Sequence, residues 1–178
     1  MTLEMFEQDV RQLRGARLLR VRYYELPGGW PAWDAVAKCD TVDHGLDLIC
    51  DTGTFHITWD STFWSYGLRV NRGALLDQLR AALVTEVTED SRWAPLIGQH
   101  ITDVTVYWED VPTPNLGDGT RYPQDIALTF ELGARVFLSA AIYEDSSHTL
   151  FRMSDNVVVV FDELFAQCLR VGPFERPE

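Results

Sequence analysis

Polar and apolar positions alternate along this chain with two different periods. Between Leu3 and Leu13 apolar side chains recur on one face of a helix, and Gly15 supplies a left-handed stop. This segment is therefore predicted to be a helix. A stripe of leucine and alanine at helical spacing predicts a second helix over residues 73–84, and residues 163–170 are predicted to form a short helix or strand.

Most other apolar residues recur at every second position, which is the period of a β-strand. The pattern is clearest after the turn at Gly133, where Val136, Leu138 and Ala140 fall on one face. The predicted fold class is α+β, a mainly antiparallel sheet with helices packed on one side. The predicted strands cover residues 17–24, 46–51, 54–60, 66–70, 101–109, 125–131, 135–143 and 156–161.

The order of these segments indicates that one small unit occurs twice. Leu13-Arg14-Gly15 matches Leu96-Ile97-Gly98, and the match continues at the same offset into the strand that follows. A third match requires an insertion in the second copy and is the weakest. The matched blocks are residues 13–15 with 96–98, 46–53 with 126–133, and 67–70 with 156–159.

This repeat predicts one compact domain over residues 1–172, made of two similar halves at about 10–84 and 93–171. The two halves are expected to share one continuous sheet. Residues 173–178 are expected to form a flexible tail. Because positions shared by both copies define the scaffold, the stretches that differ are the places to look for function.

The chain is acidic, with a net charge of −12 over 178 residues. Such a charge opposes binding to nucleic acid, whose phosphates are bound by cationic side chains, and suits either a basic partner or simple solubility. There is no long apolar run and no basic-then-apolar N-terminal pattern, so no membrane span or signal peptide is predicted and the protein is expected to be cytoplasmic. Cys39, Cys50 and Cys168 are scattered, which favours reduced thiols over disulfides or a zinc site.

One local motif suggests a specific chemistry. Asp51-Thr52-Gly53 follows an apolar run and resembles the Asp-Thr-Gly signature of aspartic proteases, which need two aspartates that share a proton. The repeat places Glu131-Leu132-Gly133 where the second signature is required, so another copy of the chain would have to supply that aspartate. The simpler interpretation is that both segments are hairpin turns in which glycine takes a positive φ.

The histidines and serines specify no reaction. No His-Glu-x-x-His spacing and no Gly-x-Ser-x-Gly elbow occurs, so no catalytic residue, metal site or cofactor is predicted. His56 alternates with Phe55 and Ile57 on a predicted strand and should point away from the face that they fill. It is interpreted as a surface histidine, with a ligand role beside Asp60 as the alternative.

Two long loops rich in proline and glycine differ between the halves, at residues 27–34 and 110–123. Loops of this length are usually functional or disordered. Their aromatic residues are candidate anchors of an interface with an acidic rim; alternatively, the tryptophans fold back as lids over the sheet edge. An acidic hairpin tip is predicted at residues 144–148. The candidate partner-binding residues are Trp30, Trp33, Trp108, Glu109, Asp110, Asp118, Tyr122, Asp125, Glu144 and Asp145.

Three segments stand out in the second half: Tyr107-Trp108-Glu109-Asp110, Tyr122-Pro123-Gln124-Asp125 and Val157-Val158-Val159-Val160-Phe161-Asp162-Glu163. In them the chain resembles the small acidic immunity proteins that bacteria encode beside secreted toxins. The resemblance implies a cytoplasmic protein that neutralises a cognate, basic toxin by direct binding. The alternative is a small enzyme or ligand-binding protein that uses a cleft between the halves, with Asp51, Glu131 and His56 as its first candidates. Neither interpretation fixes the oligomeric state.

Overall fold

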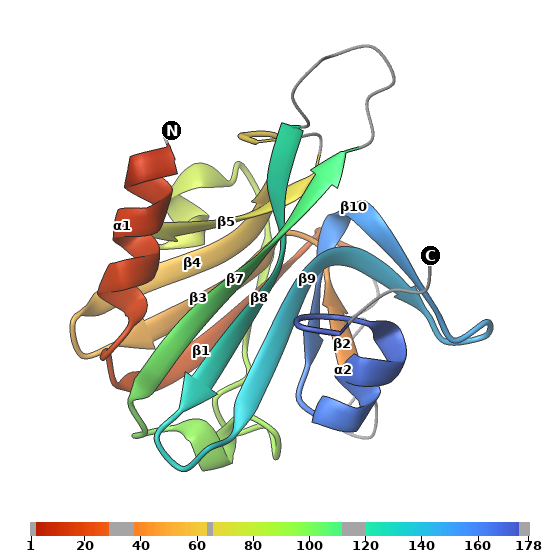
Figure 1. Ribbon diagram of the computed structural model, residues 1–178. Coiled ribbons are helices and arrows are strands. Elements are labelled where there is room, and N and C mark those ends of the chain that lie inside the picture. The colour runs from red at the N-terminus through yellow and green to blue at the C-terminus, as the bar shows by residue number, and fades with distance from the viewer. Residues whose placement is uncertain (1–2, 29–37, 64–65, 112–119, 175–178) are drawn as a thin grey trace.

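Two five-stranded antiparallel sheets face each other in the computed structural model, which describes residues 3–28, 38–63, 66–111 and 120–174 (Figure 1). The fold is broadly α+β, as the alternation of apolar residues predicts. The expectation of one continuous sheet is wrong. An isolated β-bridge between Arg17 and His100 links the two sheets at one end.

The strands of each sheet come mainly from one half of the chain. The first sheet has the order β5-β4-β3-β1-β6 and the second the order β2-β10-β9-β8-β7. The first contains β1 (Leu18–Glu25), β3 (Gly45–Cys50), β4 (Gly53–Asp60), β5 (Gly67–Arg72) and β6 (Leu83–Glu86). The second contains β2 (Cys39–Val42), β7 (Ile101–Val111), β8 (Thr120–Phe130), β9 (Arg135–Glu144) and β10 (Thr149–Val160).

The inner faces of both sheets fill one hydrophobic core. Leu48 and Phe55 of the first sheet and Ile126 and Leu138 of the second are all buried in it. Strand alternation explains this, because residues two apart along a strand face the same side. The space between the two halves is therefore occupied by core side chains.

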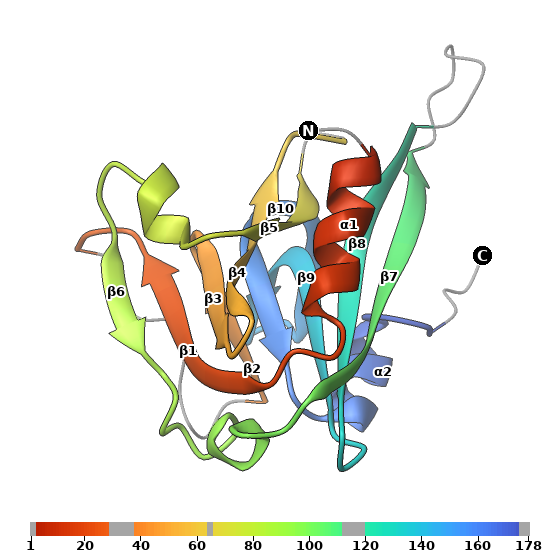
Figure 2. The ribbon, with the colours of Figure 1, turned by 90° about the vertical axis from the view of Figure 1, so that its left-hand side faces the viewer.

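The two helices lie on different sides, so the expectation of helices packed on one side is wrong. Helix α1 (Leu3–Leu13) contacts β5 and β7 and adds Phe6 and Leu13 to the inner core, where it closes one opening of the sandwich (Figure 2). Helix α2 (Glu163–Leu169) packs on the outer face of the second sheet. Each helix goes where an apolar surface would otherwise stay open.

The segments that match in sequence take equivalent places in the two sheets. Strands β1-β3-β4-β5 and β7-β8-β9-β10 form meanders with the same order. At their starts the backbone bonds are reciprocal: Gly15 N–H donates to Ile101 O, and Gly98 N–H donates to Leu18 O, both at 2.7 Å. This junction has a local two-fold relation. A meander is a common topology, so the duplication itself stays a prediction.

One predicted helix is wrong. Within residues 73–84 only Leu75–Gln78 is helical, as the short 3-10 helix η1, and Leu83 already begins strand β6. The β-branched Val84 and Thr85 pair with the edge of β1, whose free hydrogen-bonding groups outweigh the local helical pattern. Strands β2 and β6 escaped the sequence analysis, and a second 3-10 helix, η2 (Ala94–Leu96), precedes β7.

Candidate functional site

A largely buried ionic network lies on the outer face of the second sheet, with Asp125 buried and Arg152 and Glu109 partly exposed. The Arg152 Nη1 of β10 donates to Glu109 Oε1 at 2.9 Å and to both carboxylate oxygens of Asp125 at 3.1 and 3.2 Å. Tyr122 Oη donates to Glu109 Oε2 at 3.0 Å. Three predicted partner-binding residues are thus brought together by an arginine that the sequence analysis missed. The only local hint in the sequence is that Arg152 stands just before the point where the strand-like alternation of β10 is interrupted.

Asp125 is an internal residue instead of the exposed rim residue that the sequence suggested. Asp125 is 2% exposed as a whole residue, and its carboxylate also accepts from Gly172 N–H at 3.0 Å. Burial raises the pKa of Asp125, and the charge of Arg152 and the Gly172 N–H limit that rise. The same Arg152 donates through Nη2 to the backbone oxygen of Arg170. The network therefore ties β7, β8 and β10 to the C-terminal segment.

A hollow of about 350 Å³ lies beside this network, between β7 and the C-terminal segment. Among its polar walls, Glu109 and Asp125 are already engaged by Arg152. At its edge the exposed Arg121 and Asp110 form an ion pair at 3.4 Å. The lining residues are Val106, Tyr107, Trp108, Glu109, Arg121, Asp125, Gly172, Pro173 and Phe174.

Of the three tryptophans predicted to anchor an interface, only Trp108 lies within the described residues. Trp108 is partly buried, with its ring edge-on to Phe6 and Phe63 at centroid distances of 5.7 and 5.3 Å. It therefore packs against α1 from within strand β7 (Ile101–Val111). Trp30, Trp33 and Asp118 lie outside the described residues.

The predicted acidic hairpin tip joins β9 to β10. Glu144 ends β9, and Asp145 follows with a side chain that is 91% exposed. Ser147 Oγ donates to Glu144 Oε2 at 2.6 Å, which orders the turn. In Figure 1 this hairpin extends beyond the body of the two sheets.

The same hairpin has two dissimilar faces. On one face Tyr143 packs edge-on against Phe165 of α2 at 5.6 Å. On the other, Ile142 and Phe151 are cross-strand partners and are 37% and 53% exposed. Met153, which is 42% exposed, comes two residues later. We call the exposed cross-strand pair Ile142 and Phe151 the apolar face of the hairpin. An exposed group of this kind next to charged residues is typical of a docking surface.

A bulge in β10 sets the direction of the hairpin. Arg152 pairs with Ala141, but Val157 pairs with Ala140, so residues 153–156 have no counterparts on β9. Met153 has a φ of 52°, a left-handed conformation that is rare for its residue type. Arg152 anchors one end of the bulge, and Asn156 Nδ2 anchors the other by donating to Asp43 Oδ1 at 3.1 Å. Bulges redirect strands in this way near functional surfaces.

Of the residues suggested for a cleft between the halves, Asp51 and Glu131 lie on neighbouring hairpin turns, but His56 lies elsewhere. Asp51 accepts from Arg17 N–H at 2.9 Å, and Glu131 lies 3.3 Å from His100 Nδ1. The two hairpin turns are neighbours because Arg17 and His100 are bridge partners. His56 belongs to the opposite, outer face of the first sheet.

The hairpin-turn interpretation of the Asp-Thr-Gly motif is confirmed. Gly53 and Gly133 have φ values of 134° and 86° at the β3–β4 and β8–β9 turns. The Asp51 carboxylate is engaged by Arg17, a cation, where a protease dyad would place a second carboxyl group. Glycine recurs in both turns because each requires a positive φ at that position. The threonine does not recur, because the turn does not require it.

His56 points away from Phe55 and Ile57 as predicted, but it is buried and not a surface residue. Its Nδ1 lies 2.9 Å from Gly73 O, so this nitrogen donates, and Nε2 accepts from Asn71 Nδ2 at 3.0 Å. Gln78 of η1 approaches the same Nε2 at 3.2 Å. Burial lowers the pKa of His56, which favours the neutral ring.

The described residues contain no group of three or more histidine, cysteine or acidic side chains arranged to hold a metal ion. Burial raises the pKa of the Cys39 and Cys50 thiols to about 12. Neither of the described α-helices combines the length and apolar character needed to cross a bilayer.

No protein-family model, curated protein or solved structure matches this chain.

Proposed function

We propose that this chain is a binding protein that neutralises a basic protein toxin, as bacterial immunity proteins do, and that the β9–β10 hairpin makes the contact. The observation that carries the proposal is the apolar face of the hairpin beside its acidic tip. Ile142 and Phe151 are exposed on it, and Glu144 and Asp145 follow at the turn. The toxin and its chemistry are not specified by this surface.

The physical case combines anchoring and steering. An exposed aromatic residue beside an aliphatic one supplies the desolvated centre of an interface, where a few residues carry most of the binding energy. The net charge of −12 and the acidic tip attract a basic partner over a Debye length of about 8 Å at physiological salt. The chain is thus suited to fast association with a cationic protein.

The hairpin is also held in place before any partner arrives. Arg152 fixes one end of its bulge to Asp125, and Tyr143 packs the face opposite Ile142 and Phe151 against Phe165 of α2. Binding through such a preorganised element costs less conformational entropy than ordering a free loop. The ionic network therefore has an indirect part in binding, by positioning the hairpin.

A capture experiment with a matched control tests the contact. The double variant Ile142→Ser/Phe151→Ser and the single variant Leu132→Ser all alter exposed apolar residues on β-hairpins, and Leu132 is 83% exposed on the β8–β9 turn. Wild type and Leu132→Ser should capture a basic protein from the source cells and rescue growth when that protein is expressed. The double variant should lose both. Equal capture by all three proteins would refute the hairpin as the contact, and capture of no basic protein would refute the proposed function.

Charge steering has a separate kinetic test once the partner is known. Glu144→Gln/Asp145→Asn should slow association several-fold at low salt and leave dissociation nearly unchanged, because rim charges act mainly on the encounter. Glu4→Gln, at an exposed acid on α1, is the control and should change neither rate. An association rate that does not depend on salt would contradict steering.

Ligand binding is the second candidate function, and the hollow of about 350 Å³ is the observation that favours it. Its aromatic walls and the exposed Arg121 would suit a small aromatic or anionic compound. A small-molecule screen by thermal shift with wild type and Arg121→Ala tests this. Compounds that raise the melting temperature of wild type alone would support the candidate, and none doing so would remove it.

A further inference from the structure

Strand β7 is an edge strand whose second side is only partly used. In the described part of the chain it pairs with β8 alone, at the end of its sheet. At its start, Gly15 N–H donates to Ile101 O, and Ile101 N–H donates to Ala16 O. A little further along, Arg14 Nη2 donates to Val104 O at 3.5 Å. The residues at the end of α1 and just after it therefore cover the edge of β7 as far as Val104.

Beyond Val104 the same edge is open. In an antiparallel pair, successive residues turn their N–H and C=O groups alternately toward the partner strand and away from it. Because Val104 turns its C=O away from β8, Val106 and Trp108 turn theirs away too, and no other described residue bonds to these outward groups. The register shift near Trp108 skips Gln124 of β8, so the alternation within β7 continues. An open row of this kind is a template for a further strand.

Two hollows flank the open stretch, one toward each face of the second sheet. Val106 and Trp108 line both of them. The inner hollow, of about 260 Å³, lies between these residues and α1, where Phe6 and Val10 make its wall apolar. The outer hollow is the one of about 350 Å³ between β7 and the C-terminal segment, with Tyr107 in its wall. Figure 2 shows β7 at the margin of its sheet, with α1 on one side and the C-terminal segment on the other.

This arrangement matches the way in which an added strand presents its side chains. Successive side chains of a strand point to opposite faces of the sheet, so a segment paired with β7 places one side chain in the inner hollow and the next in the outer one. The backbone bonds of such a segment supply affinity, and the alternate hollows supply specificity. From Val106 to Val111 the open stretch is about 20 Å long, at about 3.4 Å per residue.

The charges around the outer hollow favour a basic side chain. The charged residues that line it, together with their ion-pair partners, comprise three carboxylates and two guanidiniums. They are Glu109, Asp110, Asp125, Arg121 and Arg152. One negative charge therefore remains without a cation at this hollow, and a lysine or arginine side chain would complement it.

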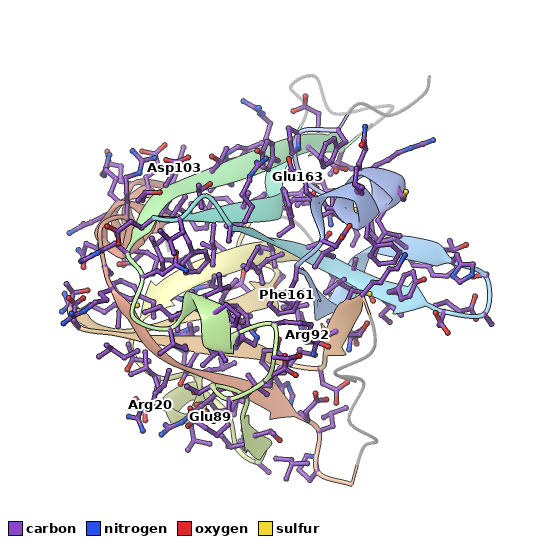
Figure 3. All side chains as sticks on the ribbon, turned by 90° about the horizontal axis from the view of Figure 1, so that it is seen from below. Arg20, Glu89, Arg92, Asp103, Phe161 and Glu163 are labelled. Atoms are coloured by element: carbon purple, nitrogen blue, oxygen red, sulfur yellow. The ribbon has the colours of Figure 1, made fainter. Side chains whose placement is uncertain are left out.

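On the side of α1 the charges cancel. Glu7 and Arg11 line the inner hollow and form a pair at 4.0 Å. Arg14 lies 2.6 Å from Asp103, which Figure 3 shows on β7 on the side of α1. The inner hollow therefore suits an apolar side chain. A second copy of this chain is a poor occupant, because both copies carry a net charge of −12 and repel each other.

We propose that the open stretch of β7 binds an extended basic segment of a partner protein as an added strand. An apolar side chain of that segment enters the inner hollow, and a lysine or arginine next to it enters the outer one. This surface includes neither Ile142 nor Phe151, so it does not depend on the hairpin contact proposed above. A small compound would occupy the outer hollow alone, whereas an added strand also bonds to the backbone of β7.

Selection of phage-displayed random heptapeptides on the immobilised whole protein tests the chemistry of the segment. Enriched peptides should alternate apolar residues with lysine or arginine. An acidic consensus, a consensus without alternation, or no enrichment at all would overturn the proposal. The double variant Ile142→Ser/Phe151→Ser is the control and should select the same peptides. Loss of enrichment in that variant would place the contact on the hairpin and would also overturn the proposal.

The pairing of backbones has its own test, with an enriched peptide resynthesised and labelled. Val106→Pro and Val106→Ala both shorten the side chain, but only proline removes the outward N–H, and an edge strand tolerates proline where that group is unpaired. The peptide should bind Val106→Pro at least about ten-fold more weakly than Val106→Ala, because a hydrogen bond is lost and the ring obstructs the added strand. Equal affinities would contradict strand addition.

Hydrogen exchange in the wild-type protein gives an answer even if Val106→Pro does not fold. The bound peptide should slow exchange of the Val106 and Trp108 amides, which face outward, and leave unchanged the Tyr107 amide, which faces β8. The same peptide N-methylated at alternate residues should lose this protection when its outward-bonding amides are the ones blocked. Exchange at Val106 and Trp108 that the peptide does not slow would show binding without an added strand and would overturn the proposal.

Discussion

The outer faces of the two sheets bury polar side chains in different ways. On the first sheet Asp47 accepts from Tyr24 Oη at 2.5 Å and from Leu75 N–H at 2.9 Å, and His56 is bonded by neutral groups under η1. On the second sheet Asp125 is matched by the full charge of Arg152 under the C-terminal segment. The two meanders have the same strand order, but η1 is held on one by hydrogen bonds from neutral donors and the C-terminal segment on the other by a charged network.

The difference shows which part of the structure each set of buried polar side chains holds in place. On the first sheet, hydrogen bonds from neutral donors hold the short helix η1 in place over the sheet. The charged network on the second sheet spans three strands and ends at the bulge that directs the β9–β10 hairpin. A charge-assisted network fixes geometry more strictly than neutral bonds do, which suits the half that carries the proposed contact.

The largest expected effect breaks the charged side of this comparison. Arg152→Ala leaves Asp125 and Glu109 without their cation and should destabilise the protein by about 3 to 5 kcal/mol, as loss of one partner of a buried ion pair does. Urea unfolding at pH 7 measures it. Arg121→Ala removes an exposed ion pair and should change stability little. Similar losses in both variants would show that the network contributes no special stability.

A smaller effect concerns the cover over that network. A methyl group at Gly172 would lie 3.0 Å from a ring carbon of Phe137, whereas one at Gly133 has nothing within 4 Å. Both glycines have positive φ, so Gly133→Ala measures backbone strain alone, at about 1 kcal/mol. Gly172→Ala should cost about 1 to 2 kcal/mol more because it displaces the segment from Phe137. Equal losses of stability would mean that the C-terminal segment moves away from Phe137 at no energetic cost.

The smallest effect tests the neutral side of the comparison. Because burial lowers the pKa of His56, its contribution to stability is present above the unfolded pKa of about 6.5 and is lost as pH falls through the folded value. His56→Gln should therefore flatten the decline in melting temperature between pH 7 and pH 5.5. His148→Gln, at the exposed hairpin tip, should leave the decline as it is. A decline unchanged by His56→Gln would contradict a neutral buried ring.

Local periodicity determined most of the strands and the side on which their residues point. Phe55 and Ile57 fill the core while His56 faces away, as alternation alone requires. The opening helix from Leu3 to Leu13 and the glycine turns at Gly53 and Gly133 also follow from residues adjacent in sequence. These features depend on contacts and torsions within one strand, helical turn or hairpin.

Contacts between residues far apart in the sequence were decided by the tertiary structure alone. The pattern at residues 73–84 is helical, yet Val84 is in a strand because the edge of β1 lies beside it. The sequence marks Glu109 and Asp125 as acidic but does not reveal that Arg152 lies between them. Periodicity encodes which face a residue takes. Which group it meets there depends on how the two sheets close, and that is set by the packing of the whole chain.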